Sequence, residues 1–321
     1  MRPGLLLAVL AALCAPGCVS ATDAPAADVG PDAAARAASQ LAARRAADEA
    51  DFLRQLDQTL ATRQKEDPAT LLTTLEHLLP AWESEQRRGR EEPIERIITL
   101  RVVCNLDAVL AAFEQGARER QLVAAWALGF ARVPPNALGI ESPHARARVA
   151  LVKGLQSRDD AMLRNVLLGL WKLHDAETPL RPLLDLMVQH HDPDVRSNAA
   201  LAVGAVIDDA TLPAALDSLL VALADKEPKV RLHVASAAQR HPAPAFTERL
   251  LGALPTEEVP LVRASMAAAL GAARSKAAAP LLLTMIDSAR EIESSTAHAA
   301  LVAIFGQDLG VHGADWVGVV K

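Results

Sequence analysis

The stretch that decides the fold is Asp192-Pro193-Asp194-Val195-Arg196. Its first aspartate is a preferred N-cap residue, and the proline after it suits the first position of a helix, where no amide hydrogen is needed. The same form returns as Glu227-Pro228-Lys229-Val230-Arg231 and as Val259-Pro260-Leu261-Val262-Arg263. The stretch predicts a turn followed by a helix, and its recurrence predicts a repeated unit.

Four arginines mark one position in successive units, at intervals of 32, 35 and 32 residues. They are Arg164, Arg196, Arg231 and Arg263. Apolar residues lie one before, three after and seven after each arginine, and these offsets share one face of an α-helix. A second apolar column lies twelve and nine residues before each arginine. Each unit is therefore expected to be two antiparallel helices.

A helix pair of this size cannot bury its apolar face alone, so neighbouring units must stack. The composition agrees, because 51% of the 321 residues are hydrophobic but only 3% are aromatic, and there is no tyrosine. Strands favour the aromatic and β-branched residues that this chain mostly lacks. The sequence predicts an all-α solenoid of stacked antiparallel helix pairs, without sheet.

The arginines and the turn before them are interpreted as structural. A cation in the first turn of a helix opposes the helix dipole, so each arginine should have a compensating carboxylate in its own or the next unit. Asp192 and Pro193 are expected to cap and start their helix. We therefore expect Arg164, Arg196, Arg231 and Arg263 to link successive units.

These residues resemble the HEAT-repeat family, in particular the short bacterial units called HEAT-like or phycobilisome-lyase-type repeats. The resemblance is good for residues 144–274 and weaker for residues 106–132 and 277–305. It implies an armadillo-like superhelix whose second helices line a concave side that holds a partner. Six positions should face that side, namely Asn198, Leu201, His233, Ser236, Arg240 and Ser265.

The first residues have the layout of an export signal. Arg2 precedes an apolar stretch from Leu5 to Leu13, which is shorter than the roughly 20 residues of a membrane-spanning helix. Ala15-Pro16-Gly17-Cys18 resembles the lipobox of bacterial lipoproteins, which implies lipidation of Cys18 and a membrane anchor in the cell envelope. Ordinary cleavage after Ala21 is the alternative, and it would leave an exported, periplasmic protein.

The expected organisation has five parts. They are a signal peptide (1–18), a flexible tether (19–32), N-terminal helices (33–92), the repeat solenoid (93–305) and a C-terminal capping segment (306–321). The cap should cover the exposed end of the stack.

Local signatures of catalysis are missing from the sequence: it has no phosphate loop, no G-x-S-x-G elbow and no H-E-x-x-H pair. His190 and His191 next to Asp192 are metal-ligand types. Asp192 is assigned to capping, however, and adjacent histidines are expected to point in different directions, so a solvated turn is predicted there. Cys104 is expected in the core. We expect no catalytic residue, cofactor or metal.

The net charge of −6 argues against a nucleic-acid partner, which needs a clustered positive field. The sequence thus favours a non-enzymatic scaffold of the bacterial cell envelope that binds another protein, with no small-molecule substrate evident. The alternative, implied by the resemblance, is an accessory or catalytic subunit related to phycobilin-lyase-type proteins.

Overall fold

The computed structural model describes residues 66–132 and 142–320, together with scattered helical residues between 39 and 58. The expected signal peptide, Cys18 and the tether lie outside the described residues, as does most of the expected first helix. Within the described ranges every regular element is a helix. The predicted all-α class is confirmed. No helix in these ranges has both the length and the apolar character needed to cross a membrane.

The chain divides into two compact units, residues 1–147 and 148–321. The first unit contains α3 (Pro68–Gln86), α4 (Glu92–Cys104), α5 (Leu106–Gln115), α6 (Arg118–Ala127) and the short η1 (Leu128–Phe130). Here α3 packs on α4, and α5 packs on α6. Consecutive helices of this unit therefore pair with each other.

The core of the first unit is built around Trp82, whose side chain is fully buried on α3. The rings of Trp126 and Phe130 meet it edge to face, with centroids 6.3 and 5.2 Å away. The Trp82 indole N–H donates to Glu95 on α4 at 3.2 Å. Arg101 of α4 forms an ion pair with Glu66, at the start of the described range. Three aromatic rings therefore form the centre of the core of this unit.

The second unit begins within α7 (Pro143–Gly154) and contains α8 (Asp160–Leu173) and four further helix pairs. The pairs are α9 (Leu180–Gln189) with α10 (Pro193–Val206), α11 (Leu212–Ala222) with α12 (Pro228–Arg240), α13 (Pro244–Ala253) with α14 (Pro260–Ala272), and α15 (Ala279–Ile286) with α16 (Glu291–Phe305). Short η2 (Leu254–Thr256) and η3 (Lys276–Ala278) lie between helices, and α17 (Gly313–Trp316) ends the unit.

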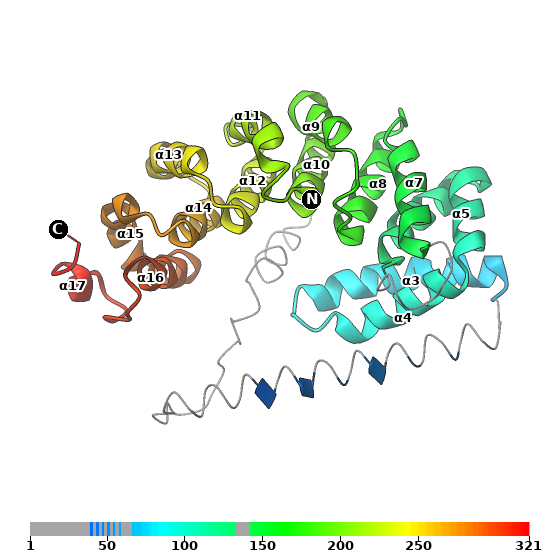
Figure 1. Ribbon diagram of the computed structural model, residues 1–321, viewed down its shortest axis with the longest axis horizontal. Coiled ribbons are helices and arrows are strands. Elements are labelled where there is room, and N and C mark those ends of the chain that lie inside the picture. The colour runs from blue at the N-terminus through cyan, green and yellow to red at the C-terminus, as the bar shows by residue number, and fades with distance from the viewer. Residues whose placement is uncertain are drawn as a thin grey trace. The chain divides into compact units, whose positions relative to one another are not determined.

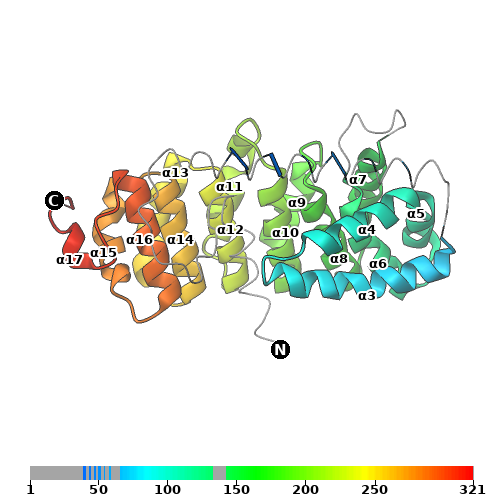
Figure 2. The same ribbon diagram turned by 90° about the horizontal axis from the view of Figure 1, so that it is seen from below.

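The helix pairs of the second unit stack in two rows, as Figure 1 and the turned view in Figure 2 show. The A row consists of the first helices, α9, α11, α13 and α15. The B row consists of α8, α10, α12, α14 and α16, each packed on the next. This arrangement confirms the predicted solenoid of stacked antiparallel pairs.

Small residues allow the helices of the B row to approach closely. A Cβ atom added at Gly271 of α14 would lie 2.7 Å from the Cα atom of Ala300 on α16. At Gly204 of α10 an added Cβ would lie 3.2 Å from the Cβ of Ala237 on α12. The abundance of alanine and glycine in the sequence thus determines the spacing of this row.

The turn before α10 has the expected capping geometry. The Asp192 carboxylate accepts hydrogen bonds from the amides of Asp194 at 2.7 Å and Val195 at 3.1 Å, and Pro193 is the first helical residue. Neither Glu227 nor Val259 caps its helix through the side chain. Instead, Asp225 accepts from the Glu227 amide at 2.8 Å, and Glu257 accepts from the Val259 amide at 3.0 Å.

The C-terminal segment packs against α15 through α17. Trp316 is fully buried, and its indole N–H donates to the Gly310 carbonyl at 2.7 Å. Gly310 has a φ of +126°, a conformation that side chains rarely adopt. The Gly313 amide donates to Asp287, which follows α15, at 3.1 Å. These contacts attach the segment to the last repeat.

Candidate binding groove and arginine ladder

Three of the four marker arginines lie within 3.2 Å of a carboxylate oxygen of the next repeat. Arg196 on α10 binds Asp225 before α12 through two hydrogen bonds of 2.8 and 3.0 Å. Its remaining nitrogen donates to the carbonyls of His190 and His191 in its own turn, at 3.0 and 3.1 Å. One buried guanidinium thus joins its own turn to the next one.

The same arrangement recurs further along the unit. Arg231 binds Glu257 with two bonds of 2.7 and 2.8 Å and donates to the Asp225 carbonyl at 2.7 Å. Arg263 lies 3.2 Å from a carboxylate oxygen of Glu293 on α16. We call these three pairs the arginine ladder: Arg196–Asp225, Arg231–Glu257 and Arg263–Glu293.

Two of the three ladder acids, Asp225 and Glu257, have a second function. Asp225 and Glu257 both lie six residues before an arginine, where they cap a turn amide and also bind the arginine of the preceding repeat. Burial raises the pKa of Asp225, but the hydrogen bonds from Arg196 and the Glu227 amide outweigh it and hold that pKa below its usual value. In Glu257 the effect of burial is outweighed by Arg231 and the Val259 amide, and its pKa is also lowered. Both acids therefore stay ionised near neutral pH.

Arg164 departs from this pattern. Its side chain is 39% exposed, and the nearest carboxylate oxygen, on Asp194, is 3.6 Å away. The reason is the residue six before Arg196, which is His190 instead of an acid. The His190 ring accepts from the Asp192 amide at 3.2 Å, so it replaces the capping function of the acid but not its bond to arginine.

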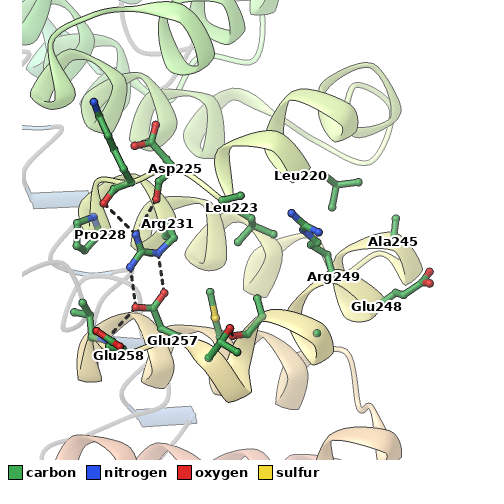
Figure 3. A pocket seen from close by; sticks show the side chains of 17 residues that line it. Leu220, Leu223, Asp225, Pro228, Arg231, Ala245, Glu248, Arg249, Glu257 and Glu258 are labelled. Carbon is green, nitrogen blue, oxygen red and sulfur yellow. Dashed lines mark hydrogen bonds and ion pairs between the residues drawn. The ribbon is translucent and has the colours of Figure 1, made fainter.

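An open groove lies beside the ladder, between repeats α11–α12 and α13–α14 (Figure 3). Its volume is about 1080 Å³. Apolar and small residues of both repeats line it, namely Leu220, Leu223, Ala245, Gly252, Ala253 and Met266. The Arg231–Glu257 pair lies at one end, as the dashed bonds in Figure 3 show.

Charged side chains surround the apolar part of the groove. Arg249 of α13 lies near Leu220 in Figure 3. Among the described residues the Arg249 side chain has no hydrogen bond or ion pair. Lys226, Glu248 and Glu258 complete the charged lining. The groove thus combines an apolar surface with a cation that is available to a ligand.

The six positions expected on the concave side lie differently from that expectation. Leu201, His233, Ser236 and Ser265 are all buried, with Leu201 and His233 each 6% exposed. Asn198 and Arg240 are half-buried. The six residues lie on α10, α12 and α14, each of which is flanked by two B-row helices, so side chains off the apolar face contact a neighbouring helix instead of solvent.

Specific contacts show where these side chains go. The Asn198 amide donates to the Arg164 carbonyl of α8 at 3.2 Å. The hydroxyls of Ser236 on α12 and Ser265 on α14 lie 3.2 Å apart. These residues join helices of the B row in this structure, and a role in partner binding remains only a prediction.

His233 and Arg240 are unusual because these two basic side chains of α12 have no ion pair with a carboxylate among the described residues. Burial, with smaller effects of Arg240 and Lys229, lowers the pKa of His233 to about 4, and its Nδ1 atom has no hydrogen-bond partner among the described residues. Burial also lowers the pKa of Arg240, whose guanidinium donates to the Ser236 carbonyl at 3.4 Å. The His233 ring is therefore neutral near pH 7.

Cys104 is half-buried instead of lying fully in the core. Burial and the nearby Glu66 raise the pKa of its thiol. Since the thiolate is the reactive form, this cysteine is poorly suited to nucleophilic chemistry.

The comparisons with known proteins agree with the repeat pattern. Residues 148–222 match the family model described as HEAT repeats, so this part of the chain is similar to that family. Comparison with the curated proteins gives no match.

Solved structures with some likeness include a designed armadillo repeat protein, 18% identical over 62% of this chain and 100% of its own, with a TM-score of 0.46. Another is Kap121p, 14% identical over 81% of this chain and 32% of its own, also with a TM-score of 0.46. These values are too low for the likeness to bear on function.

Proposed function

We propose that this protein is a non-enzymatic scaffold of the bacterial cell envelope that holds a segment of another protein in the groove between α11 and α13. The observation that supports this most directly is the groove itself, which joins an apolar surface to the cation of Arg249, a side chain with no acid partner among the described residues. A protein segment with an apolar face and an acidic side chain opposite Arg249 would match it. Burying apolar surface is the main favourable contribution to such binding.

The arginine ladder makes one end of the groove rigid and preformed. Arg231 and Glu257 are held by two mutual hydrogen bonds and by turn atoms, so they need no rearrangement when a partner binds. A preformed surface loses less conformational entropy on binding, which favours affinity. Arg249 supplies specificity, because a partner without an acid there would leave it unpaired.

The chemistry of the groove supports the non-enzymatic part of the proposal. General acid–base catalysis works best with a group whose pKa is near the operating pH. The two most enclosed acids of the groove, Asp225 and Glu257, have lowered pKa values and are bound by arginines. They are structural groups.

The envelope location and the lipid anchor rest on the sequence. The signal layout and the lipobox-like Ala15-Pro16-Gly17-Cys18 support a lipidated Cys18. Mass spectrometry of the mature N-terminus tests this directly, and a diacylated Cys18 is the expected result. An unmodified Thr22 at the N-terminus would contradict the anchor.

Site-specific crosslinking tests the groove. A photoreactive residue at Gly252 would project into open space, since an added Cβ meets no atom within 4 Å. The matched control is Val149 on α7, which is 66% exposed and does not line the groove. In the native envelope we expect a discrete protein adduct from position 252 that is absent from position 149.

Charge reversal makes the crosslinking result specific. Arg249→Glu should abolish the adduct while leaving stability within about 0.5 kcal/mol, as is usual for surface changes. Identical adducts from positions 252 and 149, or no effect of Arg249→Glu, would contradict the proposed groove. Covalent transfer of a bilin to an acceptor by the purified protein would instead support the enzyme alternative.

A further inference from the structure

The junction between α8 and α10 lacks a ladder acid but has a different cluster of polar side chains. Asp160, at the start of α8, faces His190 and His191 of the turn before α10. The Nε2 atom of His191 lies 3.2 Å from one oxygen of Asp160, and the Nε2 atom of His190 lies 3.8 Å from the other. The three side chains therefore converge from two successive repeats.

The rings of the two histidines do not point in different directions, contrary to the prediction from the sequence. Their ring centroids are 4.5 Å apart and their planes differ by 30°. The expectation failed because the Arg196 guanidinium binds both histidine carbonyls, which orders the turn with the rings side by side. One potential ligand atom from each of the three residues lies within 4.8 Å of the others.

We propose that Asp160, His190 and His191 form a binding site for a zinc-type transition metal ion that links the two repeats. Imidazole nitrogen and carboxylate oxygen are the ligands that zinc uses besides thiolate, at about 2.0–2.2 Å. Tetrahedral zinc with such bonds has neighbouring ligand atoms about 3.4 Å apart. The separations of 3.2 and 3.8 Å, to the two oxygens of Asp160, are near this value, and one ligand atom from each of the three residues lies within 4.8 Å of the others, so side-chain movements would bring them to it.

The repeat pattern gives the site a structural reason. At the later junctions an arginine lies within 3.2 Å of an acid of the next repeat. Here His190 stands in the place of that acid, and Arg164 pairs only with the more distant Asp194, at 3.6 Å. The ion would take over the link, with Asp160 from one repeat and both histidines from the next as ligands. Water would complete the coordination, because His191 is 78% exposed.

Binding also has costs. The His190 Nδ1 atom accepts the Asp192 amide hydrogen, so the neutral ring has its proton on Nε2. Coordination through Nε2 moves that proton to Nδ1 and ends the 3.2 Å contact with the amide. The cation of Arg164 lies close by and opposes the ion, whereas the carboxylates of Asp192 and Asp194 favour it. The Asp192 cap keeps the turn in place meanwhile.

Zinc titration of the full chain, first treated with a chelator, tests the site by calorimetry. We expect saturable binding of Zn²⁺ at this site and a higher thermal unfolding midpoint, with no such effect of Mg²⁺, which prefers all-oxygen ligands. His191→Ala and Asp160→Asn should each weaken zinc binding by about tenfold or more, since loss of even an outer-shell partner costs 10–100-fold. Both side chains reach solvent, so both variants should fold.

His312→Ala is the matched control. His312 is also exposed, at 75%, and also lies 3.8 Å from one carboxylate, that of Asp287, but it has no second histidine beside it. We expect this variant to bind zinc as the original chain does. Equal zinc affinity in the original chain and in His191→Ala, or loss of binding in His312→Ala, would overturn the assignment.

Discussion

The B row and the A row of the second unit solve the packing of repeats in different ways. B-row helices touch through glycine, alanine and serine, and the ladder joins their turns. In the A row, α9 packs on α11, but a groove of about 1080 Å³ lies between the next two repeats. The B row is therefore packed continuously, whereas the A row has an open groove between α11 and α13.

The largest expected effect comes from breaking the ladder beside the groove. Glu257→Ala leaves the enclosed Arg231 without its acid and removes the bond to the Val259 amide. We expect this variant to lose about 3 kcal/mol of unfolding free energy, which is the cost of removing one partner of a buried pair. Urea unfolding measures this loss. Arg164→Ala is the control, because its exposed contact contributes less than about 1 kcal/mol. Equal losses in the two variants would show that the ladder does not stabilise this row.

Substitution of one glycine in each row tests the difference between the two rows with a smaller expected effect. Gly271→Ala places a Cβ 2.7 Å from the α16 backbone, so overpacking should reduce the free energy of unfolding by about 1–2 kcal/mol despite the better helix propensity of alanine. Gly252→Ala in the A row meets no atom, so propensity alone should raise stability by about 0.5 kcal/mol. Changes of the same sign in both variants would contradict the difference between the rows.

The smallest effect is expected from mild acidification. Asp225 and Glu257 have ordinary pKa values of 3.8 and 4.5, and the fold lowers both. Their contribution to stability is complete above these ordinary values and is lost as the pH falls through the lowered ones. The unfolding midpoint should therefore change little from pH 7 to 5 and decrease below about pH 4.5.

Glu257→Gln provides the comparison for this pH dependence. Its stability should decrease less below about pH 4.5 than that of the original chain, because one of the two acids no longer titrates. A parallel decrease in the two proteins would assign the effect to other carboxylates.

The fold could be predicted because a repeat multiplies weak signals. The turn at Asp192 and Pro193 and the spacing of the arginines recur in register, and each unit needs a neighbour to cover its apolar face. The family match to residues 148–222 falls within the part where the pattern is strongest. Periodicity therefore suffices to predict the helix pairs and their stacking.

The candidate site was much harder to predict. The helical period indicates which side chains face away from the core but not how closely the next helix approaches, so Ser236 and Ser265 were expected at the surface and are buried. The groove depends on the separation of α11 and α13, for which the sequence has no periodic signal. Arg249 attracts no notice in the sequence, because only the coordinates show it without an acid.

The ladder has a consequence for how such a chain changes length. Each pair, or rung, of the arginine ladder takes its arginine from one repeat and its acid from the following repeat. Arg196 and Arg231 each bind an acid that lies six residues before the next marker arginine. Deleting the segment between equivalent points of two repeats would bring Arg196 opposite Glu257 and restore a complete rung. Duplication would likewise create a new rung with both halves present. Modules joined in this way are interchangeable, so the array can lengthen or shorten in evolution without leaving a charge unmatched.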